Sequence, residues 1–375
     1  MPVAEEYVLK ALASCRSAAL GAHRLACDHC GHNQVAYNSC RNRHCPKCQA
    51  GARGEWLEAR RADLLPVGYF HVVFTLPASL AQLAWQNKRV MYEALFCASA
   101  ETLQEIAADP KHLGAKIGFL AVLHTWGQNL LHHPHVHCVV PGGGLAADES
   151  RWVACRANFF LPVRVLSRVF RGKYLARLRQ AYRRGELSFH GDLARHASPA
   201  AFEAWLKQSY LTDWVVYAKP PFGGAEQVLK YLARYTHRVA ISNDRLLSME
   251  GDQVTFRWKD YARGQRWRTM TLAATEFIRR FLLHVLPSGF MRIRHYGFLA
   301  NCHAQAKLDV CRRLLGVSQT VDCDRADEVS AVSTAPDEAE AERCPSCGVG
   351  RLWVVETRPR PTAHHVRRSW PFDSS

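Results

Sequence analysis

The sequence predicts an α+β fold, in which one domain of mixed strands and helices follows a small segment rich in cysteine and histidine. Two C-x-x-C pairs lie within residues 23–50, where the apolar residues show little periodicity. Across residues 67–315, short β-branched and aromatic stretches alternate with long helical patterns, which is typical of a single α+β domain. An acidic stretch at 318–342, rich in Ser, Thr, Ala and Pro, predicts a disordered linker.

Four parts are therefore expected along the chain. Residues 1–66 hold an N-terminal helix and the cysteine-rich segment, and residues 67–317 form the main domain. The linker occupies residues 318–342, and a small tail that again contains cysteine and histidine occupies residues 343–375.

Each element follows from a local pattern. Residues 68–76 (GYFHVVFTL) are β-branched and aromatic and stop at Pro77, which predicts a strand. Similar composition predicts further strands at 117–126, 135–140, 213–218 and 290–296, and a hairpin at 253–260 and 267–272. Apolar periodicity predicts helices at 1–20, 51–66, 79–108, most of 150–212, 225–238, 275–286, and from the last strand to about 315.

The charge balance points to an anionic partner. The 375 residues include 49 Lys and Arg against 33 Asp and Glu, which gives a formal net charge of +16. For a chain this basic, nucleic acid is the leading candidate. The 48% hydrophobic content excludes a chain that is disordered throughout or collagen-like.

The sequence favours a reducing compartment and no membrane partner. Glu5 and Glu6 stand where a signal peptide needs positive charge, and no continuous apolar region follows them. The most apolar stretch, residues 67–85, is interrupted by polar residues and is not expected to span a membrane. Paired cysteines in such a chain indicate metal binding, not a disulfide framework.

A structural zinc site is expected in the N-terminal segment. Cys27 and Cys30 form one C-x-x-C pair, and Cys45 and Cys48 form a second pair, with fourteen residues between the two pairs. Four thiolates at such spacing close a tetrahedral zinc site and can fold a segment that lacks a hydrophobic core. Nearby side chains that could replace a ligand or hold a second zinc are His23, His29, His32, Cys40 and His44.

A third C-x-x-C pair, Cys344 and Cys347, lies in the C-terminal tail. By itself the pair is half of a zinc site. His364 with His365, or Cys323 upstream, could complete it, and the pattern alone does not decide whether zinc binds there.

A His-x-His strand is the strongest candidate for a second kind of metal site. On a strand, side chains alternate between the two faces, so His133, His135 and His137 share one face. The opposite face carries Val136, Cys138 and Val140 and can pack on a helix. Two imidazoles held two residues apart on a rigid strand form half of a site for a divalent cation.

Two tyrosines one helical turn apart are candidates for nucleophiles. On the predicted helix at 225–238, Tyr231 and Tyr235 are four residues apart and project from one face. Such a stripe is more often part of a core, and the histidine strand in the same chain is what favours a catalytic role. Five basic side chains suit contact with DNA phosphates: Arg41, Arg43, Lys47, Arg234 and Arg238.

These segments together resemble a known family. Residues 74–77 (Phe-Thr-Leu-Pro), the His135–His137 pair and the Tyr231–Tyr235 pair occur in the order of the three motifs of HUH endonucleases. The segments at 40–48, 124–128 and 292–297 narrow the resemblance to two-tyrosine, rolling-circle insertion-sequence transposases with an N-terminal zinc-binding domain. The resemblance covers about residues 20–315.

The resemblance implies a fold and a mechanism. The fold is a small antiparallel sheet with helices, with the two histidines on a central strand. Mg²⁺ or Mn²⁺ on His135 and His137 would polarise a scissile phosphate of single-stranded DNA. One tyrosine would attack and keep the 5′ phosphate, and the other could take a second strand. The third metal ligand stays open among His133, Gln227 and His124.

The implied function is a DNA transposase of the bacterial cytoplasm, associated with the nucleoid. A plasmid or phage replication initiator or a relaxase would use the same chemistry in a different role. A non-enzymatic, zinc-containing DNA-binding protein would explain the charge and the cysteines but leave the histidines and tyrosines without a function. A transposase with a carboxylate triad is disfavoured, because no acidic cluster accompanies the candidate core.

Overall fold

The structure, a computed structural model, divides the chain into two compact units. It describes residues 3–48, 54, 56, 60–61, 63–219, 227, 240–260, 264–316 and 343–361. Unit 1 combines Met1–Ala50 with Thr320–Ser375, and unit 2 is Gly51–Gln319. Residues 51–66, which the sequence assigns to the N-terminal part, therefore belong to the larger unit.

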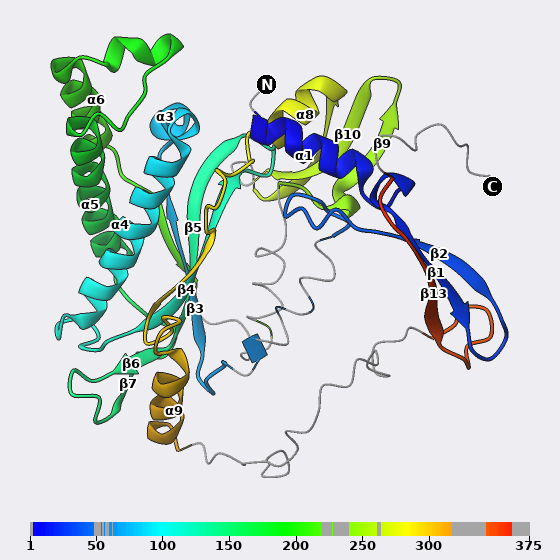
Figure 1. Cartoon of the computed structure of the whole chain (residues 1–375). Coiled ribbons are helices and arrows are strands. Elements are labelled where there is room, and N and C mark those ends of the chain that lie inside the picture. The colour runs from blue at the N-terminus through cyan, green and yellow to red at the C-terminus, as the bar shows by residue number, and fades with distance from the viewer. Residues whose placement is uncertain are drawn as a thin grey trace. The chain divides into compact units, whose positions relative to one another are not determined.

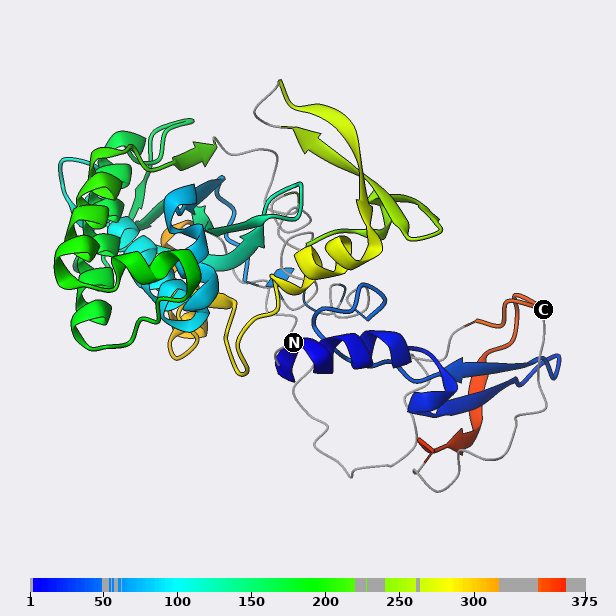
Figure 2. The same ribbon diagram turned by 90° about the horizontal axis from the view of Figure 1, so that it is seen from above.

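Unit 1 is built on a three-stranded antiparallel sheet in the order β13-β1-β2 (Figure 2). Helix α1 (Val3–Ser14) and the short turn η1 (Ala18–Leu20) precede β1 (Ala22–Cys27) and β2 (Asn33–Tyr37). The third strand, β13 (Leu352–Arg358), comes from the other end of the chain. The C-terminal residues thus complete the N-terminal sheet, whereas the sequence predicts a separate tail.

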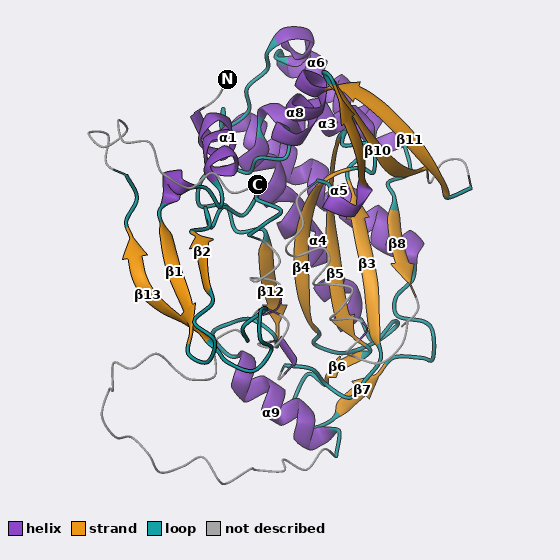
Figure 3. Ribbon diagram, turned by 90° about the vertical axis from the view of Figure 1, so that its right-hand side faces the viewer, coloured by secondary structure: helices purple, strands orange, loops and turns teal. Residues whose placement is uncertain are grey.

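Unit 2 contains a five-stranded antiparallel sheet in the order β12-β4-β5-β3-β8 (Figure 3). Its strands are β3 (Tyr69–Thr75), β4 (Gly118–Trp126), β5 (His132–Pro141), β8 (Val216–Lys219) and β12 (Ile293–Gly297). All five were predicted from sequence, and β5 is the central strand.

Helices cover one face of this sheet (Figure 1). They are α3 (Ala81–Gln86), which follows the turn η2 (Ala78–Leu80), then α4 (Lys88–Ala108), α5 (Val163–Arg183) and α6 (Pro199–Leu211). The alternation of side chains along three strands supplies the apolar face that these helices bury. The strand residues in this core are Phe70, Val72, Phe74, Phe119, Ala121, Leu123, Val136, Cys138 and Val140. Their burial fixes the register of the sheet, because a slip of one residue would turn them to the opposite face.

A second small sheet flanks the first within unit 2. It has the order β11-β10-β9, with β9 (Leu246–Glu250), β10 (Gln253–Asp260) and β11 (Arg266–Ala273). The turn η4 (Asn243–Arg245) leads into it and helix α8 (Ala274–Leu282) follows it. The predicted hairpin is therefore confirmed, with β9 as an additional strand.

The remaining elements are short. The hairpin of β6 (Gly143–Leu145) and β7 (Trp152–Ala154) packs with helix α9 (Ala304–Leu314) in a cluster that includes Leu145 and Leu308. The turn η3 (Gly191–His196) joins α5 to α6. Among the described residues, no helix is both long and apolar enough to cross a membrane.

Arg294 ties the edge strand β12 to the helical layer. Its Nη1 and Nη2 atoms each donate to a carboxylate oxygen of Glu93 on α4, both at 2.7 Å. Its guanidinium also stacks 4.2 Å from the centre of the Phe96 ring. This two-pronged contact needs the planar guanidinium, which lysine does not have.

We predict that Arg294→Lys lowers the free energy of unfolding by about 1–2 kcal/mol, because the two-pronged pair with Glu93 and the contact with the Phe96 ring are both lost. Arg279→Lys is the matched control, since Arg279 makes a similar but more exposed pair with Glu276 within α8. Its effect should stay within about 0.5 kcal/mol. Chemical denaturation of the full chain measures both, and equal effects would contradict the structural role given to Arg294.

Candidate metal centres

Three histidines of the five-stranded sheet meet on the face opposite the helices. His135 and His137 lie two residues apart on β5, and His124 lies on β4 directly opposite His135. One ring nitrogen from each lies within 4.8 Å of the others. The ring centres of His124 and His137 are 4.2 Å apart, and those of His135 and His137 are 4.8 Å apart. A divalent cation could bind all three.

The environment of His135 and His137 favours the neutral form that a metal requires. Burial lowers the pKa of His135 to about 3 and holds the pKa of His137 well below its usual value. Nδ1 of His135 donates to the backbone carbonyl of His133 at 2.6 Å, which leaves Nε2 as the atom with a lone pair. Neutral imidazoles with one nitrogen already used in this way are ready metal ligands.

His71 on β3 orients His137. In the register of β3 and β5, Val73 lies opposite His137, and the two side chains share one face of the sheet. His71 is two residues from Val73 along β3, so its side chain lies on that face too. Nε2 of His71 lies 2.7 Å from Nδ1 of His137, and the rings are stacked with centres 4.9 Å apart. Burial lowers the pKa of His71 to about 4, so this contact joins two neutral rings. A hydrogen bond at Nδ1 directs Nε2 of His137 toward a metal.

His124 occupies the third position in the cluster. It is one of the three candidates for the third metal ligand, with His133 and Gln227. The side chain of His133 is exposed and outside the cluster: its ring centre lies 5.3 Å from that of His135, and its carbonyl accepts from Nδ1 of His135. Gln227 is helical and its side chain is exposed. Tyr231 and Tyr235, with Arg234 and Arg238, lie outside the described residues, so their catalytic and DNA-binding roles stay predictions.

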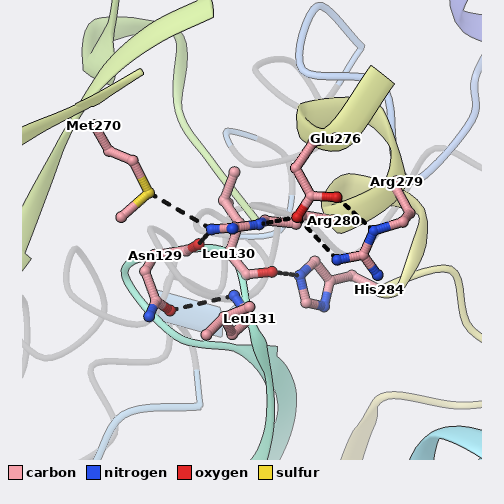
Figure 4. Close-up of polar contacts among 8 residues, drawn as sticks. All are labelled: Asn129, Leu130, Leu131, Met270, Glu276, Arg279, Arg280 and His284. Atoms are coloured by element: carbon pink, nitrogen blue, oxygen red, sulfur yellow. Dashed lines mark hydrogen bonds and ion pairs between the residues drawn. The ribbon is translucent and has the colours of Figure 1, made fainter. Parts of the chain in front are cut away.

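Residues from α8 and the segment after it hold the connection between β4 and β5 (Figure 4). Arg280 donates through Nη1 to the carbonyl of Asn129 at 3.1 Å, and Nε2 of His284 donates to the carbonyl of Leu130 at 3.0 Å. Glu276 pairs with Arg280 and keeps its guanidinium in place. The hydroxyl of Thr125, next to His124 on β4, lies 3.2 Å from Nδ1 of His284. The loop that sets the start of the histidine strand is thus held at the carbonyls of Asn129 and Leu130.

The cysteines of unit 1 form two clusters, which corrects the single site expected from sequence. Cys27 and Cys30 lie with Cys344 and Cys347. Cys45 and Cys48 lie with two other cysteines, Cys15 and Cys40. The reason is the hairpin: Cys27 and Cys30 are at its turn, and β2 carries the chain back before Cys40. A five-residue strand separates its ends by roughly 17 Å, too far for one metal site.

The cluster of Cys15, Cys40, Cys45 and Cys48 joins the end of α1 to the loop after β2. Sγ of Cys15 lies 3.4 Å from Sγ of both Cys45 and Cys48, and Sγ of Cys40 lies 3.5 Å from that of Cys48. Arg41, Arg43 and Lys47 lie in the same loop, and the side chains of Arg41 and Lys47 are exposed. Cys40 was among the alternative ligands, whereas the lone Cys15 gave no pattern by which the sequence could identify it.

Two family models match this chain. One is described as "Putative transposase" and matches residues 118–306, which include all three clustered histidines. The other is described as "Transposase zinc-binding domain" and matches residues 1–76, which include the cluster around Cys15.

Curated proteins and solved structures add to these matches. "Putative transposase y4qJ" of Sinorhizobium fredii (strain NBRC 101917 / NGR234) is 55% identical over 95% of this chain and 90% of its own length. "Transposase for insertion sequence element IS801" of Pseudomonas savastanoi pv. phaseolicola is 30% identical over 79% of this chain and 70% of its own length. The solved structure titled "The structure of TrwC complexed with a 27-mer DNA comprising the recognition hairpin and the cleavage site" is 13% identical, covering 66% of this chain and 74% of that one. Its TM-score is 0.24, too low to support an argument. The two family models and the two curated relatives show that the chain belongs to the family of insertion-sequence transposases that carry an N-terminal zinc-binding domain, as its motifs predict.

Proposed function

We propose that the protein is an HUH-type transposase that nicks and joins single-stranded DNA at transposon ends through a 5′-phosphotyrosine intermediate. The observation that supports this most strongly is the cluster of His124, His135 and His137 on one face of the sheet, in a chain of the transposase family. The relatives named as transposases favour this role over a replication initiator or a relaxase.

The three histidines fit a divalent cation such as Mg²⁺ or Mn²⁺. Their neutral rings offer three nitrogen donors, fewer than such ions accept, so positions remain for oxygens of a bound phosphate. The bound ion would withdraw charge from the scissile phosphate. The chain itself supplies the rigid placement, because two ligands come from one strand and the third from its neighbour.

The nucleophile in this proposal is the phenol oxygen of Tyr231 or Tyr235. Its attack forms a bond from oxygen to phosphorus, and the bond from phosphorus to the 3′ oxygen breaks. The 5′ phosphate then stays on the tyrosine, and the part of the same strand beyond the nick is released with a free 3′ hydroxyl, whose oxygen gains the proton that the phenol gives up. The second tyrosine could accept a second strand in the same way. Arg234 and Arg238 are proposed to hold the DNA backbone beside them.

Binding to DNA is proposed to rest on the basic charge of the chain. The net charge of +16 suits a polyanion, and Arg41, Arg43 and Lys47 offer a local basic group in the loop that carries Cys40, Cys45 and Cys48. We propose that the protein acts on nucleoid DNA in the bacterial cytoplasm, and its named relatives are from bacteria.

Replacing Tyr231 and Tyr235 together by Phe should abolish the covalent protein–DNA adduct. The phenol oxygen is the proposed nucleophile, whereas basic side chains supply affinity, so the DNA dissociation constant should stay within about threefold of the parent value. The assay incubates the full chain with a labelled single-stranded transposon end and Mn²⁺ and resolves the adduct by denaturing electrophoresis. An adduct of normal yield from the double variant would disprove the assignment.

His124→Ala should weaken Mn²⁺ binding by more than about 100-fold. Loss of a group that only hydrogen-bonds to a metal ligand already weakens metal binding by about 10- to 100-fold, and loss of a direct ligand should cost more. His135→Ala and His137→Ala should do the same, and all three should lose cleavage. His133→Ala is the matched control: its carbonyl remains, so binding should change by less than about twofold. Calorimetric titration with Mn²⁺ measures each value. A large loss with His133→Ala and none with His124→Ala would reverse the choice of the third ligand.

A further inference from the structure

We propose that Cys27, Cys30, Cys344 and Cys347 bind a second structural zinc ion, one that fastens the C-terminal segment of the chain to its N-terminal hairpin. The zinc-binding family model ends at residue 76 and so includes only half of these ligands. The inference is independent of the proposed catalytic role.

The four sulfur atoms already have the spacing of a tetrahedral zinc site. Sγ of Cys27 lies 3.8 Å from Sγ of Cys347, and Sγ of Cys30 lies 3.7 Å from Sγ of Cys344. All four atoms lie within 4.8 Å of one another. With Zn–S bonds of about 2.3 Å, a regular tetrahedron has S–S edges of about 3.8 Å. A disulfide would need a separation of about 2.05 Å, so the geometry favours a shared metal.

The two cysteine pairs have the same backbone shape. Each is followed by a glycine, Gly31 or Gly348, with a positive φ of 70° or 67°. The N–H of Gly31 donates to the carbonyl of Cys27 at 3.2 Å, and that of Gly348 donates to the carbonyl of Cys344 at 2.9 Å. Two C-x-x-C-G turns of one shape, facing each other with their sulfurs, form the two halves of a zinc site.

Backbone amides further prepare these sulfurs to carry negative charge. The N–H groups of His29 and Cys30 point to Sγ of Cys27 at 3.4 and 3.5 Å, and the N–H of Gly350 points to Sγ of Cys347 at 3.3 Å. N–H donors favour the thiolate form, which is the form that binds metal.

Asp28 holds the two halves in register. One carboxylate oxygen accepts from the N–H of Arg351 at 2.8 Å, and the other accepts from Nε1 of Trp353 at 3.0 Å. The N–H of Asp28 in turn donates to the carbonyl of Arg351 at 3.1 Å. These contacts continue the pairing of β1 with β13, in which Cys27 lies opposite Leu352.

A metal is needed because the described residues of unit 1 around these cysteines form very little apolar core. The buried cluster around the site consists of Cys27, Cys344 and Leu352, with Leu25 and Cys347 partly buried beside them. A core this small cannot by itself hold the C-x-x-C turn before β13, in which Cys344 is 314 residues from Cys30, since closing so long a loop costs entropy. Zinc would supply that missing stability.

The test is the zinc content of full-length protein purified without chelators, together with the Cys344→Ser/Cys347→Ser double variant. We expect the variant to lose one zinc ion per chain relative to the parent, while the cluster of Cys15, Cys40, Cys45 and Cys48 keeps its own. Cys302→Ser, at an exposed cysteine outside both clusters, is the control and should keep the parent value. Limited proteolysis should cut residues 343–361 of the double variant and spare them in the parent.

An unchanged zinc content in the double variant would overturn the proposal. So would a disulfide between Cys27 and Cys347 or between Cys30 and Cys344, detected by mass spectrometry without reductant. If the variant does not fold, X-ray absorption of the parent decides: two zinc ions per chain, each with four sulfur ligands, support the proposal. One zinc, or mixed nitrogen and sulfur ligands, contradicts it.

Discussion

The pairing register of β4, β5 and β3 is the constraint on which the candidate catalytic site depends. Val136, Cys138 and Val140 are buried under the helices, so the alternate residues His135 and His137 must face the other way. The same register sets His124 and His71 beside them from the flanking strands. A slip of one residue would bury imidazoles in the apolar core. The free-energy cost of burying these polar rings there fixes the position of all four.

The sequence predicted what depends on local pattern. The alternation on β5 gave the shared face of its histidines, and β-branched composition gave the strands of the main sheet. Strands β1 and β2 were missed because polar and charged residues interrupt their apolar ones, and β13 was missed because its residues were assigned to a tail. The role of His71 could not be seen, since its contact with His137 spans 66 residues and depends on the register of two strands. Tyr231 and Tyr235 lie outside the described residues.

The cysteines show why spacing can identify a metal but misassign its ligands. Two C-x-x-C pairs separated by fourteen residues suggested one site, but the β-hairpin between them sends the pairs to opposite ends. Each pair instead meets cysteines that are distant in sequence. One signal was present: Cys27–Gly31 and Cys344–Gly348 share the pattern C-x-x-C-G, which could have linked the two ends of the chain. Pairing across 314 residues is otherwise a property of the folded unit alone.

The central claim is that His124, His135 and His137 together form the site of the catalytic cation. The most direct measurement is a crystal structure of the full chain grown with Mn²⁺ and recorded at the manganese absorption edge. The account predicts one anomalous peak in the sheet, within bonding distance of a ring nitrogen from each of the three histidines. A manganese ion bound elsewhere in unit 2, or one that excludes His124 and binds Gln227, would contradict it.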